Sequence, residues 1–392
     1  MRYRRKYCIG ITITLIAAAW CMQVRAAEDK APPVKPLDDA HKAKVLKLTD
    51  RGVKYLLTQT DAKGGWSMGQ GANRPAITGM VLKTLVQHPD YDASSSVVVK
   101  GFKTLMTHRK SDGGFYEPNV GLPNYTTSIA IMAMVASGDP QYKSAIDKGV
   151  KFLRTQQIRP GDKTPKGEKV KKGEGFDGGV SYGKHGRPDG SNQQMWIQAM
   201  SDAGVKADDP DMQRANAFMM RLQNRKESNP ADYIQAGPND GGYIYALGES
   251  KAGAWRDGRG LRSYGTLTYA GFKSMLHAGM ARDDPRVQAA FKWIRRYWRL
   301  DSNPNMPKLK SQQGLFYYYH VFAKALRMWG QVEIEDTKGV KHNWRHELID
   351  ALGKRIAKDG SWTNKGSERW NEGNSVLATC FATLALQETL KK

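Results

Sequence analysis

Cysteine is scarce in this sequence, and its scarcity excludes a disulfide-stabilised fold. Only three cysteines occur in 392 residues. Cys8 and Cys21 lie in an amino-terminal segment that has the features of a secretory signal peptide, so the mature chain would keep Cys380 alone. A single thiol cannot form an intramolecular bridge, although disulfides persist in exported proteins. The fold must therefore be stabilised by packing.

The amino-terminal segment predicts export. Residues 1–7 (MRYRRKY) are basic, residues 8–22 are apolar, and VRA before Ala27 has the small-x-small form of a cleavage site. The apolar run is short for a transmembrane helix, so we expect a cleaved signal peptide over residues 1–26, with an uncleaved anchor as the alternative. The mature protein would be periplasmic or extracellular. A linker over residues 27–38 precedes one domain over residues 39–392.

Acidic residues are also few relative to basic ones. The formal net charge is +23, and it remains +18 after the signal segment, with Arg2, Arg4, Arg5, Lys6 and Arg25, is removed. This excess favours an acidic partner, such as an envelope polymer or an anionic membrane surface. No nucleic-acid motif, phosphate-binding loop, dinucleotide fingerprint or nucleophile elbow is present. We therefore expect no nucleic-acid partner and no cofactor.

What the sequence does contain is an internal repeat that occurs six times. Each unit has an amphipathic segment, a glycine-rich turn and a more apolar segment. Val287, Phe291 and Ile294 show the one-face spacing of the amphipathic segments, whereas residues 129–136 are apolar throughout, as in a helix buried on every side. The turn glycines are Gly65, Gly114, Gly179, Gly242, Gly314 and Gly360.

This pattern predicts an all-α fold of six helical hairpins. The amphipathic helices are expected over residues 41–59, 94–108, 142–157, 210–224, 284–299 and 344–358, and the apolar helices over 75–87, 126–138, 191–204, 263–279, 317–330 and 374–387. We expect an α/α toroid with the apolar helices in an inner ring and the amphipathic helices in an outer ring. An open solenoid is the alternative. Glycine at the turns supplies positive φ, and the aromatic residue that follows would fill the seam between hairpins.

The sequence at this point resembles the terpenoid cyclase and protein prenyltransferase superfamily, in particular the repeat of squalene–hopene-type cyclases. Residues 51–66 (RGVKYLLTQTDAKGGW) are similar to that whole repeat, residues 148–157 (KGVKFLRTQQ) to its first half and residues 359–362 (DGSW) to its end. Residues 264–298 are similar to an inner helix, loop and outer helix of such cyclases. The resemblance spans about residues 40–390 and implies the toroid and a tendency to hold isoprenoid-like ligands.

The resemblance does not extend to the chemistry of that superfamily. The chain lacks the Asp-x-Asp-Asp motif with which squalene–hopene-type cyclases protonate an alkene, and it lacks the zinc ligands of protein prenyltransferases and the thioester motif of complement-like toroids. Asp208–Asp209 and Asp283–Asp284 precede outer helices and are interpreted as N-cap loops. No catalytic residue is therefore implied by the resemblance.

In such a toroid the amino termini of the inner helices surround a central funnel on one face. We expect the ligand-binding side chains to be Tyr125, Trp196, Trp255, Arg262, Tyr264, Tyr317, Tyr318 and Trp370. The candidate catalytic residues are Asp189, Asp257, Glu372 and His320. The alternative is that the aromatic residues fill the ring and that ion pairs between arginines and these acids tie the loops together.

Two further signals are interpreted as structural or solvated. His342 and His346 stand four residues apart beside Glu347, but no third ligand follows in the sequence, so we expect no metal site. Residues 160–175 are rich in lysine, glycine and proline, as in a mobile surface loop, and binding of an acidic surface is the alternative.

The leading hypothesis is an exported toroid that binds a hydrophobic, isoprenoid-like ligand in its central cavity, with catalysis left open. Two other classes remain. One is a non-catalytic scaffold that binds protein or an acidic envelope polymer. The other is a glycan-active (α/α)6 enzyme, which would need two acids, or a tyrosine with arginine and histidine, facing each other across the funnel.

Overall fold

The computed structural model describes residues 36–69, 71–184, 186–256 and 258–391, which form an α/α toroid. The expected signal peptide, most of the linker and Asp257 lie outside the described residues. The outer helices are α1 (Asp39–Thr58), α3 (Ser96–Met106), α5 (Lys143–Gln156), α7 (Pro210–Met220), α10 (Pro285–Arg296) and α12 (Trp344–Gly353). The inner helices are α2 (Arg74–Val86), α4 (Pro123–Ser137), α6 (Gly190–Asp202), α9 (Gly265–His277), α11 (Leu315–Trp329) and α13 (Ser375–Leu390).

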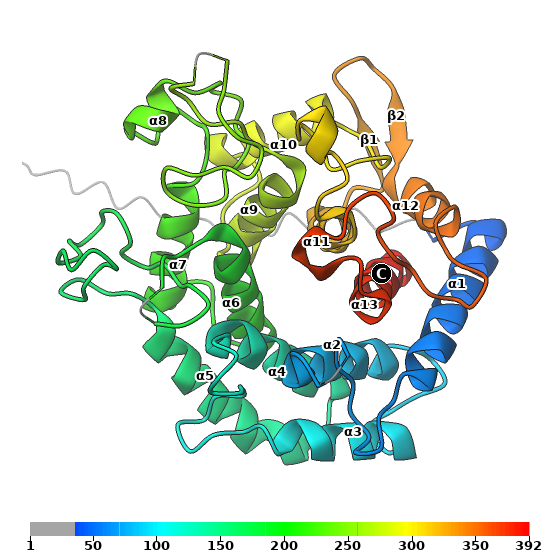
Figure 1. Cartoon of the computed structure of the whole chain (residues 1–392). Coiled ribbons are helices and arrows are strands. Elements are labelled where there is room, and N and C mark those ends of the chain that lie inside the picture. Colours follow the sequence, from blue (N-terminus) through cyan, green and yellow to red (C-terminus); the bar gives the residue numbers. More distant parts are fainter. Residues whose placement is uncertain (1–35, 70, 185, 257, 392) are drawn as a thin grey trace, which may run out of the picture.

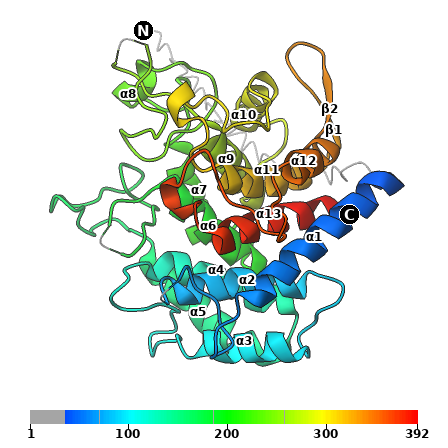
Figure 2. The same cartoon turned by 45° about the vertical axis from the view of Figure 1, so that its right-hand side comes forward.

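The inner helices form a closed ring. α2 packs on α4, α4 on α6, α6 on α9, α9 on α11, α11 on α13, and α13 returns to α2. Figure 1 shows the outer helices around the perimeter, with α1 beside α12 and α13, so that the two ends of the described chain meet. The view in Figure 2, turned by 45°, shows α1 crossing in front of α13. The predicted toroid is confirmed, and the open solenoid is excluded for the described residues.

Burial explains why the two kinds of helix take different places. On α10 the buried residues are Val287, Ala290, Trp293 and Ile294, which form one stripe, while the intervening charged residues face solvent. On α4 every residue from Thr126 to Met134 is buried. A helix with no polar face can be covered only by neighbours on all sides, which the inner ring provides.

A recurring hydrogen bond joins the glycine-rich turn to the inner helix that follows it in five of the six hairpins. The backbone N–H of the aromatic residue after the glycines donates to a threonine hydroxyl: Trp66 to Thr78 at 3.0 Å, Phe115 to Thr127 at 2.9 Å, Tyr243 to Thr268 at 3.0 Å and Trp362 to Thr379 at 2.9 Å. In the third hairpin the N–H of Val180 donates to the Gln193 side chain instead. These aromatic side chains are fully buried, as expected for residues that fill the seam.

In five of the six hairpins a turn glycine also lies against the next outer helix, whereas Gly314 in the fifth lies against Trp370. Gly113 has a φ of +93°, and a Cβ added there would lie 2.6 Å from the carbonyl oxygen of Lys148 on the next outer helix. Gly64, Gly178 and Gly241 make the corresponding contacts with α3, α7 and α10. Gly360 in the last hairpin contacts Arg51 on α1, at 2.5 Å from its carbonyl oxygen by the same measure. The contact that links successive hairpins therefore also closes the ring.

The structure differs from the sequence prediction in detail. In the first four hairpins the positive φ falls on the first glycine of the pair, one residue before the expected position. A short helix α8 (Asp232–Gln235) and a hairpin of β1 (Glu333–Glu335) and β2 (Lys341–Asn343) were not predicted, because elements of three or four residues carry almost no periodicity. Three short 3-10 helices, η1 (Pro140–Tyr142), η2 (Lys308–Lys310) and η3 (Arg369–Asn371), complete the fold.

No helix in the described part of the chain combines the length and apolar character that crossing a membrane requires.

Candidate functional site

A cavity of about 290 Å³ lies where the inner helices begin. Every inner helix or the segment just before it contributes to the wall, together with η3 and two loops. The lining residues are Met68, Asn73, Ala76, Ile77, Met80, Leu122, Tyr125, Tyr182, Ser191, Tyr245, Lys251, Tyr264, Thr266, Leu267, Gly314, Tyr317, Trp370, Asn371, Glu372, Leu377 and Phe381. The wall is mainly aromatic and aliphatic, as in pockets for small apolar molecules.

Tyrosines dominate the aromatic part of the wall. Tyr125 on α4 is partly buried and Tyr264 just before α9 is buried, and burial raises the pKa of both hydroxyls well above the usual value. The Tyr317 hydroxyl on α11 accepts a hydrogen bond of 2.6 Å from the Gln194 side chain. These hydroxyls are neutral, and the three aromatic side chains line a wall that can bind apolar chains.

Glu372 supplies the only carboxylate on the wall among the described residues. It accepts hydrogen bonds from the backbone N–H of Tyr317 at 2.7 Å and from the Asn364 side chain at 2.7 Å, so it lies against the amino terminus of α11. Burial raises its pKa to about 7, and these hydrogen bonds offset part of that rise. Glu372 is therefore partly protonated near neutral pH while it caps the helix.

Trp370 reaches the cavity through an unusual backbone. Trp370 and Asn371 have φ values of +59° and +62°, a region that bulky residues rarely adopt. This bend places the indole against Gly314, where an added Cβ would lie 2.9 Å from the ring. The side chain remains 39% exposed, so Trp370 lies at the cavity mouth.

The mouth also carries a small charged cluster. Lys251 Nζ lies 2.5 Å from the Glu249 carboxylate and 4.1 Å from the ring centre of Tyr245. Arg187 also pairs with Glu249 and lies 5.7 Å from the same ring. One carboxylate between two cations leaves this side of the mouth basic.

The structure places the predicted site residues in three groups. Tyr125, Tyr264, Tyr317, Trp370 and Glu372 line the cavity. His320 lies deeper, below the cavity on α11. The other described residues of the prediction, Trp196, Trp255, Arg262, Tyr318 and Asp189, do not line it.

The residues outside the cavity have structural partners. Trp196 is fully buried and donates from its ring nitrogen to the Leu153 carbonyl, and the Tyr318 hydroxyl donates to the Arg299 carbonyl. Arg262 lies 5.9 Å from the ring of Trp255 in a loop. Asp189 caps α6 by accepting from the N–H groups of Ser191 and Asn192, and burial raises its pKa.

The sequence prediction missed several wall residues, although a signal for some of them was present. Met68, Tyr182 and Tyr245 each follow the second glycine of a turn by three residues, and all three line the cavity. The glycine pair packs against the neighbouring hairpin, so the chain beyond it turns toward the ring centre. Lys251 carries no comparable signal, because it lies in an irregular insertion.

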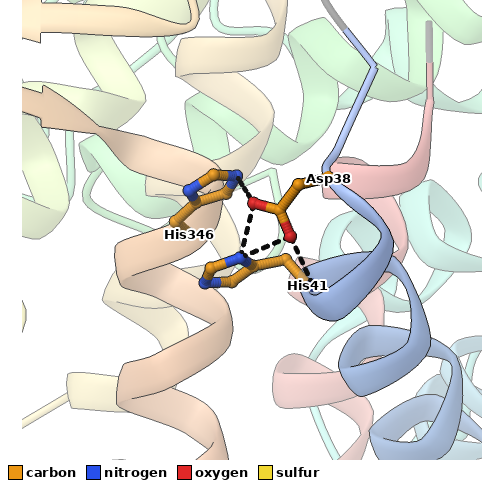
Figure 3. Close-up of side chains that lie close together, drawn as sticks. All are labelled: Asp38, His41 and His346. Carbon is orange, nitrogen blue, oxygen red and sulfur yellow. Dashed lines mark hydrogen bonds and ion pairs between the residues drawn. The ribbon is translucent and has the colours of Figure 1, made fainter.

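A group with metal-ligand residue types lies elsewhere, at the seam between α1 and α12. Figure 3 shows Asp38 beside His41 and His346, with the carboxylate 2.8 Å from His41 Nδ1 and 3.1 Å from His346 Nε2. The two imidazole rings are stacked, with centroids 3.8 Å apart and planes 3° from parallel. Lone pairs in parallel rings run side by side and do not converge on one ion, so the arrangement fits a hydrogen-bonded clasp and not a preformed metal site.

His342 is separate from this group. It lies on β2, just before α12, and pairs with Glu347 at 2.7 Å.

Comparison with solved structures supports the fold. The type II terpene cyclase MstE from Scytonema has a TM-score of 0.54 at 15% identity, covering 88% of this chain and 98% of that chain. A variant of MstE in complex with geranylgeranyl dihydroxybenzoate, its substrate, has a TM-score of 0.55 at 14% identity, covering 90% and 99%. A protein from Actinoplanes has a TM-score of 0.52 at 16% identity, covering 88% and 100%. At these identities the likeness shows the α/α toroid alone.

No protein-family model matches the sequence. No curated protein matches it either.

Proposed function

We propose that this chain binds a hydrophobic, isoprenoid-like ligand in the cavity at the centre of the toroid, after export to the periplasm or the extracellular space. One observation carries the proposal: the cavity of about 290 Å³ is walled by tyrosine, tryptophan and aliphatic side chains. Its volume lies near the lower end of the range of about 300–1,000 Å³ for small-molecule sites. An apolar chain would gain free energy by covering this wall.

The similar structures agree with this choice of ligand class. MstE, which has the same fold, takes a geranylgeranyl-bearing substrate. We transfer the ligand class to this chain as part of the proposal and do not transfer the reaction, because the acid motif of squalene–hopene-type cyclases is absent.

A glycosidase-type reaction has less support. Such enzymes place two carboxyl groups on opposite sides of the scissile bond. In the described part of the chain Glu372 is the only acid on the wall, and Asp189 is engaged as the cap of α6. We therefore propose binding without a glycosidase mechanism.

Binding can be tested by blocking the cavity. Ala76 on α2 is buried and lines the wall, so Ala76→Trp should fill much of the space. Farnesol binding, measured by isothermal titration calorimetry, should weaken at least tenfold, which corresponds to about 1.4 kcal/mol. Val99→Trp adds the same side chain at a position on α3 that is 50% exposed, and it should leave binding unchanged.

Mass spectrometry of organic extracts gives an independent test. Protein purified from its native host should release an apolar lipid, and the Ala76→Trp variant should release much less. The proposal is wrong if the wild-type protein carries no lipid and does not bind farnesol.

The acidic partner stays a separate prediction. Lys163, Lys166, Lys169, Lys171 and Lys172 are all exposed on the loop of residues 160–175. Binding of an acidic polymer through them should fall steeply as salt rises from 50 to about 500 mM, because salt screens exposed charges. Binding that does not respond to salt would count against it.

A further inference from the structure

The bottom of the central cavity, unlike its mainly apolar wall, is bordered by a lysine and a histidine. A second space of about 20 Å³ lies below it and shares the wall residues Met80, Tyr125 and Phe381 with it. Lys83 and His320 are the polar residues that border this floor chamber besides Tyr125, and the rest of its lining is Ile129, Met132, Met195 and Leu384. The chamber has room for a group of about the size of one or two water molecules.

Lys83 forms one ion pair and no hydrogen bond through its side chain in the described part of the chain. Its Nζ lies 3.8 Å from Asp202 Oδ2, which is too far for a hydrogen bond. Its side chain is only 11% exposed, and burial lowers its pKa to about 8. The ring nitrogen Nδ1 of His320 also has no hydrogen-bond partner. The floor thus presents an ammonium group without a hydrogen bond and a ring nitrogen without a partner.

The surroundings of the floor contain more cations than acids. Lys273, Lys324, Arg327 and Lys391 lie around Lys83, and Asp202 and Glu388 are the acids that act on this group. Glu388 is already engaged by Arg327 and by Lys391, the latter at 2.6 Å. Lys273 donates to the side-chain oxygens of Gln194 and Gln198, which carry no charge. Burial lowers the pKa of Lys273 well below its usual value, which reduces the positive charge at that group. An anion at the floor would offset the positive charge that remains.

We propose that the floor chamber binds the carboxylate of the ligand, whose apolar chain fills the cavity above it. The proposal rests on the proposed function and narrows the ligand to an apolar carboxylic acid. Lys83 Nζ would donate to the carboxylate as a charge-assisted hydrogen bond, and His320 would donate from its neutral ring. A ligand that ends in an alcohol would gain the same apolar contacts without neutralising the floor.

Two probes with the same alkyl chain separate the contribution of the head group to binding from that of the apolar tail. Dodecanoate and dodecanol differ only in the group that would reach the floor. At pH 7 and 150 mM salt, isothermal titration calorimetry should show dodecanoate binding at least tenfold more tightly to the wild-type protein. Lys83→Met should remove this preference and change the dodecanol affinity by less than about threefold. Equal affinity of the wild-type protein for the two probes would overturn the proposal.

Two further variants locate the carboxylate. Lys103→Met removes an exposed lysine on α3 and should leave the preference unchanged. Lys251→Met removes the basic group at the cavity mouth. If Lys251→Met abolishes the preference and Lys83→Met does not, the head group lies at the mouth and the proposal is wrong.

The outcomes also separate this proposal from the one on which it depends. If farnesol, dodecanol and dodecanoate all fail to bind the wild-type protein and it carries no lipid, the binding function itself is refuted. If farnesol binds and neither dodecyl probe does, the floor site alone is refuted. If both bind and only the preference is missing, the binding function stands and the floor site is refuted. Thermal unfolding of Lys83→Met checks the fold, and the variant should be no less stable than the wild type, because it removes a buried charge with no hydrogen-bond partner.

Discussion

At Gly113 two independent restrictions act on one residue. The backbone has a φ of +93°, and the next outer helix approaches so closely that an added Cβ would lie 2.6 Å from the Lys148 carbonyl oxygen. Gly121 in the same hairpin has a similar φ of +73°, but nothing lies within 4 Å of its added Cβ. Alanine substitution at the two glycines therefore separates the free-energy cost of a positive φ from the cost of the close contact.

Gly113→Ala should lower the free energy of unfolding by about 3 kcal/mol, because strain and overlap add. Gly121→Ala should lower it by about 1 kcal/mol, since it carries the strain alone. Urea denaturation followed by circular dichroism measures both. Equal losses in the two variants would show that the contact with α5 contributes nothing.

Glu372 should make stability depend on pH. Its pKa is raised to about 7 in the folded protein from an ordinary value of 4.5, so the folded state binds the proton more tightly than the unfolded state. The contribution of Glu372 to stability is complete below pH 4.5 and is lost as pH rises toward 7. It should amount to about 3 kcal/mol at most.

The variant Glu372→Gln should lack this contribution. The difference in unfolding free energy between wild type and variant, measured by urea denaturation from pH 4.5 to 7.5, should therefore shift in favour of the variant as pH rises. A difference that stays constant across this range would contradict the raised pKa.

The sequence could predict some site residues and not others. Tyr125, Tyr264 and Tyr317 were predictable because each lies near the start of an apolar helix, and these starts converge in a toroid. Trp196 and Tyr318 lie near the same helix starts, but their side chains point between the inner and outer rings. The direction of a side chain depends on how its helix is rotated about its own axis, and packing against neighbouring helices sets that rotation. Lys83 was not a candidate, because a single lysine near the end of an apolar helix gives no sign of the chamber that it borders.

At the scale of elements, four of the six hairpins share one hydrogen bond between turn and inner helix, here called the joint. In each of them a turn N–H donates to a threonine on the following inner helix, and the acceptor threonines are buried. Without its acceptor, the turn N–H would be buried and unpaired. The sequence predicted the turns and the helices, because glycine pairs and apolar periodicity are local. It could not predict this joint, because 12 to 25 residues separate donor and acceptor.

Two threonines on α13 test the joint. Thr379 accepts from the Trp362 N–H, whereas Thr389 donates to the Leu386 carbonyl in its own helix, and both are fully buried. Thr379→Val should lower the free energy of unfolding by about 1–3 kcal/mol, because it leaves a buried N–H unpaired. Thr389→Val leaves its carbonyl bonded within the helix and should cost less than about 1 kcal/mol. A larger loss for Thr389→Val would argue against the joint.

At the scale of the whole molecule, the ring depends on contacts between the ends of the sequence. α1 packs on α12 and α13, Gly360 contacts Arg51, and Lys44 Nζ lies 2.5 Å from Asp350. About 300 residues separate these partners, and no local pattern reports such a pairing. Closure was predictable only from the alternation of helix types, and the particular contacts were not.

The clasp of Asp38, His41 and His346 should weaken in acid. Burial and the adjacent His41 lower the pKa of His346 below its ordinary value of 6.5, while Asp38 and Asp350 partly oppose this. The unfolded state therefore binds more protons as pH falls through 6.5, and stability falls with it. The loss should stay below about 1 kcal/mol, because the ring is partly exposed to solvent.

His346→Phe keeps an aromatic ring against His41 and cannot bind a proton. Its stability relative to wild type should improve as pH falls from 7.5 to 5.5, measured by urea denaturation at each pH. Parallel stability curves for the two proteins would show that His346 does not contribute to the pH dependence.

The contact of Gly360 with Arg51 has a consequence for chain connectivity. Gly360 packs the last hairpin against the first outer helix in the way that Gly113, Gly178 and Gly241 pack their hairpins against the next outer helix. The ring therefore does not need its chain to begin at α1. Asp38 contacts His346, and the Lys391 carbonyl accepts a hydrogen bond from the adjacent Arg345, so the two ends of the described part of the chain lie near neighbouring residues. A circular permutant can be made by joining residue 391 to residue 38 through a short linker and opening the chain within residues 160–175. It should fold into the same toroid and keep the central cavity.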